Sequence, residues 1–292
     1  MQRIDANAPR ERMRVGVMVP MSLSDGVDGM PTWSDIRAFA QQADETGIDA
    51  VWVCDHFLSG EPGRPDEGIH EAWTLTAALA AVTERVRIGQ LVTCVSFRHP
   101  GLLAKMATTA NTISGGRLVL GLGAGWYDPE YEAFGYETNH RVSRLEEALA
   151  IIVPLLRGET VTHTGRYHHV AAAKLLPPPE LRIPILIAGD GPRLLRLTAR
   201  YADMWNTAWF DAPDDELERR LAALDGALAT EARDPGTLKR TVGVEFFDAS
   251  TDEIADTLAA HESLGVDEVI VGLRPATGAA LARLTRACRA LS

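Results

Sequence analysis

The chain has 292 residues, of which 46% are hydrophobic and 24% are charged, and its net charge is -11 at pH 7. This is the composition of a globular protein with enough apolar residues for a large core. The negative balance argues against nucleic acid or an anionic membrane surface as the main partner. No apolar run approaches the roughly 20 residues that a membrane-spanning helix needs.

Residues 1–13 are polar and of mixed charge, without the apolar stretch of a secretory signal. We expect them to form a disordered leader before a single catalytic domain over 14–292. The three cysteines, Cys54, Cys94 and Cys288, are odd in number and lack the spacing of a disulfide framework or a zinc site. A cytoplasmic protein without a metal site is the simplest expectation.

Strand-like and helix-like segments alternate along the rest of the chain. Thr32 and Gly47 are candidate caps for the first helix. In chain order, the predicted elements are a strand over 14–20, a helix over 32–46, a strand over 51–57, a helix over 71–83, a strand over 86–93, a helix over 100–112, a strand over 117–123, a helix over 141–156, a strand over 185–188, a helix over 192–202, a strand over 204–208, a helix over 214–230, a strand over 241–247, a helix over 252–264, a strand over 266–273 and a helix over 278–290.

Three longer segments interrupt this alternation. Residues 59–70 are rich in Gly and Pro, residues 127–139 are polar, and residues 158–184 form an irregular insertion. Within the insertion, 164–170 suggest a small hairpin and 177–179 a rigid extended run of prolines. Because loops on a rigid scaffold usually shape binding sites, we expect these segments to form the substrate pocket.

The repeated strand and helix pattern predicts an α/β protein. Residues 46–53 resemble residues 264–271, and both read as a helix end, a Gly turn and a strand. The same unit near both ends of the chain suits a closed (β/α)8 TIM barrel with insertions. An open doubly wound sheet is the alternative, but no Gly-x-Gly-x-x-Gly run follows the first strand.

The chemistry of a barrel lies where its strands end. The buried run Val51-Trp52-Val53 is followed by Asp55 and His56, and His is the side chain whose ordinary pKa lies closest to neutral pH. Alternatively, Asp55 caps the next loop and His56 is a spacer. Other predicted strand ends bear Thr93, Cys94, the run 121–126, the run 189–191, Trp205, Asn206, Glu245, Gly272 and Arg274.

These strand ends suggest a flat aromatic ligand with an anionic tail. Glycine lets a ligand approach the backbone closely, and N–H groups near a helix start bind phosphate. The run 189–192 fits such a tail, with Arg193 or Arg274 adding charge. Turn formation alone would also explain the glycines. Cys94 reads as a wall residue rather than a nucleophile, because no base is evident beside it.

Several motifs resemble those of the bacterial luciferase-like monooxygenase superfamily, and of its shorter members that use the deazaflavin coenzyme F420 in particular. The resemblance extends over nearly the whole chain from Arg14. The motifs are Asp55-His56-Phe57, Leu91-Val92-Thr93, Arg98-His99-Pro100, the runs 113–118 and 121–126, Arg144-Leu145-Glu146-Glu147 and the run 200–206.

The resemblance implies a barrel, often dimeric, that binds F420 and a small-molecule substrate. It implies His56 as the catalytic residue and Asp55 as a cofactor contact. A cis peptide and bulge that press on the ring would map to Thr93 and Cys94. The remaining implied cofactor contacts are Gly123 and Ala124 beside the ring, and Gly189, Asp190 and Gly191 near the phosphate-bearing tail. Arg274, expected near the tail from its place at a strand end, completes the predicted cofactor contacts.

Two positions depart from the family pattern. Asn111 stands where Asp is frequent, and Trp126 stands where the sugar-phosphate dehydrogenases of the family carry a catalytic Glu. The second departure argues against a sugar-phosphate substrate. The resemblance therefore predicts hydride transfer between F420 and a small organic substrate. The alternatives are an FMN-dependent monooxygenase that uses reduced flavin and O2, and a barrel that binds a ligand without turnover.

Overall fold

The computed structural model describes residues 12–25, 29–58 and 67–290. Residues 1–11 of the predicted leader and residues 59–66 of the predicted loop after the second strand lie outside these ranges. Met13 is 6% exposed and belongs to the core, so the described structure begins at the edge of the domain interior.

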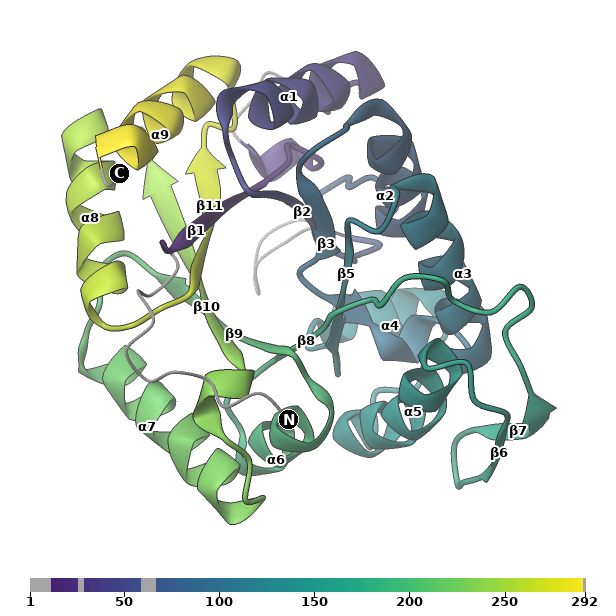
Figure 1. Ribbon diagram of the computed structural model, residues 1–292. Coiled ribbons are helices and arrows are strands. Elements are labelled where there is room, and N and C mark those ends of the chain that lie inside the picture. Colours follow the sequence, from purple (N-terminus) through teal and green to yellow (C-terminus); the bar gives the residue numbers. More distant parts are fainter. Residues whose placement is uncertain (1–11, 26–28, 59–66, 291–292) are drawn as a thin grey trace.

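Within the described residues, parallel strands form a closed barrel, which Figure 1 shows along its axis. Strand β3 pairs with both β2 and β5, and β11 pairs with β1, so the eight barrel strands form a closed ring. The barrel strands follow one another as β1 (Arg14–Met18), β2 (Ala50–Val53), β3 (Arg87–Gln90), β5 (Leu118–Gly123), β8 (Ile185–Ala188), β9 (Met204–Phe210), β10 (Lys239–Phe247) and β11 (Glu268–Arg274).

Helices surround this barrel and cover the outer face of its strands (Figure 1). The outer ring consists of α1 (Trp33–Thr46), α2 (Ala72–Val82), α3 (Pro100–Ile113), α5 (Arg141–Leu156), α6 (Pro192–Tyr201), α7 (Asp215–Thr230), α8 (Thr251–Ser263) and α9 (Gly278–Ala290). A shorter helix, α4 (Asp128–Phe134), follows β5, and 3-10 turns occur at η1 (Leu23–Asp25), η2 (Val95–Phe97) and η3 (Pro235–Thr237). The (β/α)8 barrel predicted from the sequence is thus confirmed.

Local chemistry fixes the element ends much as expected. Thr32 caps α1 in a capping box with Asp35, and Gly47 ends the helix with φ +99°. Gly265 repeats the left-handed turn before β11, with φ +84°. The two similar units, 46–53 and 264–271, supply β2 and β11, which are the two neighbours of β1. This repeat therefore spans the point where the barrel closes.

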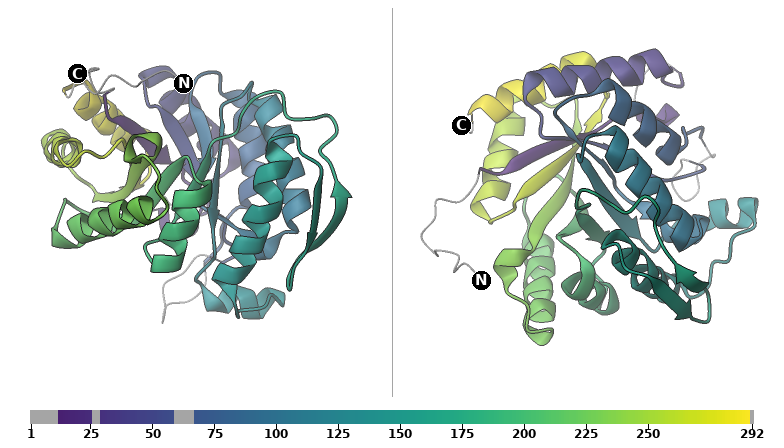
Figure 2. Two further views of the ribbon diagram at one scale, coloured as in Figure 1. Left: turned by 60° about the horizontal axis from the view of Figure 1, so that its bottom comes forward. Right: turned by 45° about the vertical axis from the view of Figure 1, so that its right-hand side comes forward.

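Three segments differ from the predicted elements. The predicted strand 51–57 is shorter, since β2 ends at Val53 and Asp55 and His56 follow it. The predicted strand 86–93 is interrupted: β3 ends at Gln90, and a two-residue strand β4 (Thr93–Cys94) follows after a break. Residues 127–139, expected to be a loop, contain α4. The predicted hairpin is present as β6 (Val161–Thr164) and β7 (His169–Ala173), and it lies outside the ring of helices (Figure 2).

A single tryptophan fills the barrel interior. Trp52 is fully buried among Ala50, Val119, Leu186, Met204 and Ile270. A Cβ at Gly16 would lie 2.4 Å from its indole, and one at Gly89 would lie 2.3 Å from it. Glycine in β1 and β3 therefore leaves the space that the Trp52 indole occupies. Below its mouth, the interior of the barrel is filled by packed side chains. No helix of the described residues is both long and apolar enough to cross a membrane.

Candidate active site

Two adjoining cavities lie at the carboxyl ends of the barrel strands. The larger cavity has a volume of about 450 Å³ and extends to the loop after β8. The smaller cavity has a volume of about 220 Å³ and extends to the end of β11. His56, Leu91, Trp126 and Trp209 line both cavities. The sequence prediction that distant strand ends form one mouth is therefore confirmed for His56.

His56 forms an ion-pair contact with a residue that the sequence did not single out. Its Nδ1 lies 3.0 Å from Oε1 of Glu130, whose side chain is 2% exposed. The other carboxylate oxygen of Glu130 accepts the backbone N–H of Phe57 at 2.9 Å. Because a carboxylate accepts and does not donate, Nδ1 carries a hydrogen, and Nε2 of the neutral ring carries the lone pair.

Aromatic packing holds Glu130 in this position. Glu130 lies on α4, and the ring of Phe57 packs against Phe134 of the same helix with centroids 4.8 Å apart. Phe57 also packs against Phe97 at 4.5 Å. Tyr131, the residue after Glu130, is fully buried beneath them. The segment after β2 and helix α4 are thereby joined through apolar contacts, which fix the His56–Glu130 pair.

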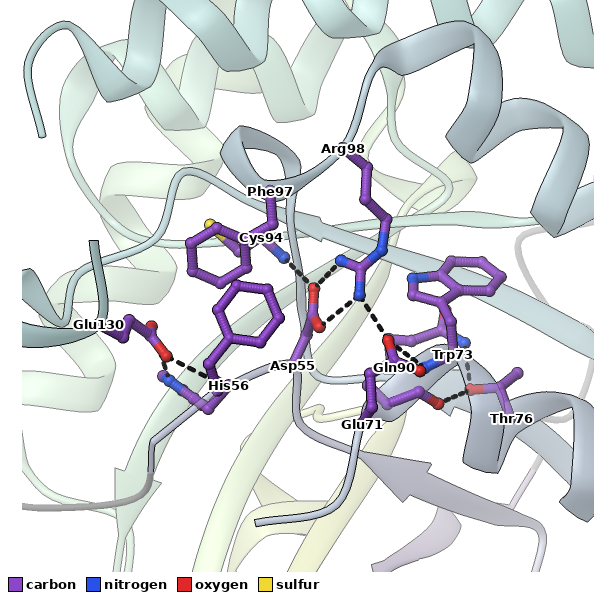
Figure 3. A network of polar contacts seen from close by, with 12 residues as sticks. Asp55, His56, Glu71, Trp73, Thr76, Gln90, Cys94, Phe97, Arg98 and Glu130 are labelled. Atoms are coloured by element: carbon purple, nitrogen blue, oxygen red, sulfur yellow. Dashed lines mark hydrogen bonds and ion pairs between the residues drawn. The ribbon is translucent and has the colours of Figure 1, made fainter. Parts of the chain in front are cut away.

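Asp55 points away from His56 and toward a different set of partners (Figure 3). Arg98 donates to both of its carboxylate oxygens, at 2.5 and 2.9 Å, and the N–H of Cys94 donates to one of them at 3.0 Å. Arg98 also pairs with Glu71 at 2.7 Å. Burial alone lowers the pKa of Arg98, but its bonds to Asp55 and Glu71 outweigh burial and raise it. Asp55 thus ties β2 to β4, although it also borders the larger cavity.

A non-proline cis peptide joins Leu91 and Val92 in the break between β3 and β4. The family resemblance implied this feature at Thr93 and Cys94, so that expectation is corrected by two residues. A Cβ at Gly121 would lie 1.8 Å from the carbonyl oxygen of Gln90, and one at Gly123 would lie 2.4 Å from Val92 Cγ2. Strand β5 therefore has glycines where the bulge presses against it.

The two residues first assigned to the bulge have different surroundings. Thr93 is fully buried and is not among the residues that line either cavity. Cys94 lines the larger cavity, and its Sγ lies 2.9 Å from the Tyr131 hydroxyl. Burial raises the pKa of the Cys94 thiol to about 11. A thiol of this kind is a wall residue, as expected, because the thiolate is the nucleophilic form.

The far end of the larger cavity lies at the loop after β8. Gly189 and Asp190 line it, whereas Gly191 precedes α6 as its N-cap residue and is not among the lining residues. Gly189 has φ +125°, and its carbonyl accepts the indole N–H of Trp205 at 2.8 Å. Trp205, which was expected at the mouth, is fully buried and holds this loop from below. Gly123 and Ala124 line the near side.

Among the described residues that line the larger cavity, Arg220 of α7 is the only arginine. It pairs with Asp190 at 2.9 Å and with Glu216 at 2.7 Å, and it donates to the Thr207 hydroxyl at 2.7 Å. Arg193, proposed for this role from the sequence, instead pairs with Glu146 of α5 on the outer surface. Nothing in the local pattern of α7 marks Arg220, which faces the cavity through tertiary packing.

Arg274 lines the smaller cavity, not the larger one. It forms ion pairs with Asp25 and, at 3.0 Å from its Nε, with Glu245. Burial alone lowers the pKa of Arg274, but the charges of Asp25 and Glu245 outweigh burial and raise it. The cofactor-tail role that the sequence gave to Arg274 thus involves a different cavity from the one that contains Gly189 and Asp190.

The mouth has two exposed tryptophans. Trp126 is 60% exposed, and its ring meets that of His56 edge-on at 5.7 Å. Trp209 is 47% exposed and follows a second non-proline cis peptide, Ala208–Trp209. Both line the two cavities, so they border any molecule that reaches His56. Trp126 was expected here from its position after β5, whereas Trp209 lies beyond the strand predicted for that region.

The sequence is similar to a known protein family and to several F420-dependent enzymes. Residues 13–287 match the family model described as luciferase-like monooxygenase. An F420-dependent glucose-6-phosphate dehydrogenase of Microbacterium testaceum is 37% identical over 205 residues, which are 68% of this chain and 60% of that protein. An F420-dependent hydroxymycolic acid dehydrogenase of Mycobacterium tuberculosis is 33% identical over 228 residues, 76% of this chain and 61% of that protein. The chain thus spans about three fifths of the length of these relatives.

Solved structures agree in fold. An F420-dependent secondary alcohol dehydrogenase in complex with an F420–acetone adduct superposes with a TM-score of 0.83 at 17% identity, over 97% of this chain and 100% of that one. Coenzyme F420 dependent tetrahydromethanopterin reductase from Methanopyrus kandleri superposes with a TM-score of 0.74 at 14% identity, over 95% and 98% of the two chains. Because the family model covers nearly all of the sequence, the chain belongs to the luciferase-like monooxygenase family.

Proposed function

We propose that the chain is an F420-dependent oxidoreductase that transfers a hydride between the deazaflavin cofactor and a small organic substrate. The observation that carries the proposal is the position of His56, which lines two adjoining cavities and is oriented by the buried carboxylate of Glu130. One cavity can take a redox heterocycle and the other its reaction partner. The F420-dependent activities named for the relatives support this choice of cofactor.

The residues of the larger cavity fit a flat ring that carries an anionic tail. Leu91, Val92 and Gly123 provide a wall of apolar atoms and bare backbone. Gly189, at the other end, has no Cβ to obstruct a tail. Helix α6 begins just after it without a side-chain cap, so backbone N–H groups of its first turn can bind an anion, whereas Arg220 is already paired with Asp190 and Glu216. Bound there, F420 would supply the two-electron chemistry, since its ring accepts or gives a hydride and reacts poorly with oxygen.

The protein itself contributes a group that exchanges one proton with the substrate, the imidazole of His56. With Nδ1 held by Glu130, Nε2 of His56 takes the proton from a substrate hydroxyl during oxidation, or returns it to a carbonyl oxygen during reduction. The Glu130 carboxylate stabilises the imidazolium that forms. Trp126 and Trp209 limit the access of water to this nitrogen, because their rings border both cavities. Asp55 has no proton-transfer role and keeps the backbone after β2 in place through Arg98.

An equilibrium titration of the purified protein with F420 and, separately, with FMN tests the cofactor. Quenching of tryptophan fluorescence reports binding, because Trp126 and Trp209 line the cavity. We expect F420 to bind at micromolar concentration and FMN to bind far more weakly. Micromolar binding of FMN without binding of F420 would instead favour the FMN-dependent monooxygenase.

Replacement of His56 by Ala tests turnover. We expect cofactor affinity to stay within about twofold and turnover to fall by roughly 10² to 10⁴, the usual contribution of a positioned acid-base group. Unchanged turnover with a true substrate would remove His56 from the mechanism. A fall in turnover that a saturating concentration of F420 restores would indicate a contact role only.

We further propose that the enzyme acts as a homodimer in the cytoplasm. None of the three cysteines, which all lie in the described part of the chain, is in a disulfide bond, which is typical of a reducing compartment. Helix α3 exposes Leu102 and Ile113, which are 54% and 47% exposed and suit an interface between copies. Analytical ultracentrifugation of the full chain tests the oligomeric state, and a single monomer peak at micromolar concentration would contradict a dimer.

A further inference from the structure

The smaller cavity contains a charged triad with an unequal number of acids and bases. Asp25, Glu245 and Arg274 all line it, and Arg274 pairs with both carboxylates. Of the described residues that line this cavity, no other is a Lys, Arg, Asp or Glu, so the triad leaves one net negative charge. An anion that enters this cavity therefore meets no unneutralised cation.

The triad is held in place from several sides. Asp25 also accepts the backbone N–H groups of Met21 and Ser22, at 2.5 and 2.6 Å. The side chain of Asp25 is 11% exposed, and that of Glu245 is 25% exposed. A Cβ at Gly272 would lie 3.1 Å from Glu245 Cγ, so this glycine leaves the room in which Glu245 lies. A substrate would have to break several bonds to free Arg274 as an anion site.

The pKa of the neighbouring Cys54 thiol responds to the same charges. Cys54 lines the smaller cavity beside His56. Burial raises its pKa to about 12, and the nearby charges of Asp25 and Asp55 raise it further, with Arg274 opposing them. The combined field around this part of the cavity thus disfavours a second negative charge.

We propose that the smaller cavity is the substrate site and that the Asp25–Arg274–Glu245 triad acts as a charge filter, which admits an uncharged hydroxyl- or carbonyl-bearing organic molecule and rejects a phosphorylated one. The inference rests on the proposed function, because it needs the larger cavity for the cofactor. The expected substrate therefore differs from glucose 6-phosphate, which appears in the names of several relatives.

Glucose 6-phosphate is the probe that tests the filter. Its affinity is measured by calorimetry on the full chain loaded with F420, as wild type and as Glu245→Gln. The glutamine keeps an oxygen for Arg274 Nε and removes one negative charge. The matched control is Asp225→Asn, which removes a carboxylate that pairs with Arg240 at 2.5 Å and does not line either cavity.

The filter predicts that Glu245→Gln binds glucose 6-phosphate at least about tenfold more tightly than both the wild type and Asp225→Asn. Equal affinity in all three proteins, including no binding to any of them, would overturn the filter. A glucose 6-phosphate-dependent rate of F420 reduction by the wild type would also overturn it, and would leave the proposed function intact. Failure of the protein to load F420 would instead count against the proposed function. The ratio of the Glu245→Gln affinity to the wild-type affinity would still decide the filter without cofactor, because Glu245 lines the smaller cavity and not the larger one.

Discussion

Glu130 and His56 are separated by 74 residues in the chain, yet Nδ1 of His56 lies 3.0 Å from the Glu130 carboxylate. Two different elements meet here, the segment after β2 and helix α4. The pair sets which ring nitrogen can exchange a proton with a substrate. Glu130 is a positioning residue in this arrangement, since it acts through His56.

The substitution Glu130→Gln should affect the two directions of the reaction unequally. The Phe57 N–H needs an acceptor, so the Gln oxygen faces it and the Gln amide donates to Nδ1. The hydrogen of neutral His56 then moves to Nε2, which can no longer act as a base. We expect turnover in alcohol oxidation to fall by roughly 10² and turnover in carbonyl reduction to fall less.

The control for this experiment is Glu132→Gln, on the same helix but exposed. F420 affinity, measured by titration, should be unchanged in both variants. If both directions of Glu130→Gln decline equally while Glu132→Gln is unaffected, the carboxylate acts by packing rather than by choosing the tautomer. Wild-type rates in Glu130→Gln would contradict the positioning role.

Two glycine-to-alanine substitutions should change stability in opposite directions. A Cβ at Gly121 would lie 1.8 Å from a backbone carbonyl oxygen, whereas one at Gly226 meets no atom within 4 Å. We expect Gly121→Ala to destabilise the protein by roughly 3 kcal/mol. Gly226→Ala should stabilise it by about 0.5–1 kcal/mol, because Gly226 is exposed within α7. Urea denaturation of both variants measures this, and a tolerated Gly121→Ala would show that the bulge moves easily.

The alternation of apolar runs and helical spacing was sufficient to predict the barrel. The caps of α1, Thr32 and Gly47, were also readable, because a capping box and a left-handed turn are local features. Helix α4 was not, since its seven residues include Pro129 and only two that are buried. A short helix of this kind depends on tertiary contacts, here those of Phe57 and Tyr131.

The candidate site was predictable only in part for the same reason. His56 stood out because a buried strand ends beside it, and the structure places it at both cavities. Glu130 and Arg220 carry no local signal, because a carboxylate or guanidinium in a polar helix resembles any solvated one. Arg274 was found from its position at a strand end, but its two carboxylate partners depend on β1 and β10 lying on either side of β11.

The Cys94 thiol should be dispensable for chemistry. With a pKa of about 11, it is almost entirely protonated near neutral pH. We expect Cys94→Ala to keep wild-type turnover and to lose about 1–2 kcal/mol of stability, since a buried sulfur is removed. Steady-state kinetics and thermal unfolding measure the two effects. Loss of turnover comparable to that of His56→Ala would mean that Cys94 takes part in the reaction.

His261 should make stability fall at mildly acidic pH. It is fully buried in α8, its Nδ1 donates to the Thr257 carbonyl at 2.8 Å, and burial lowers its pKa from the ordinary 6.5. The unfolded chain therefore takes up this proton first as the pH falls. Stability is lost below about pH 6.5, by about 1.4 kcal/mol for each unit between the two pKa values.

Replacement of His261 by Leu should remove this part of the pH dependence. Free energies of unfolding measured at about pH 7 and about pH 5 should differ less in His261→Leu than in the wild type. The exposed residue His169 provides the control, and His169→Gln should keep the wild-type difference. An unchanged difference in His261→Leu would place the acid sensitivity in other groups.

The most direct measurement is a crystal structure of the full chain grown with F420. We expect the deazaflavin ring in the larger cavity, against Leu91 and Val92 and within reach of His56, with its tail toward Gly189 and the start of α6. A ring bound in the smaller cavity beside Arg274, or one that leaves His56 without contact, would contradict this placement.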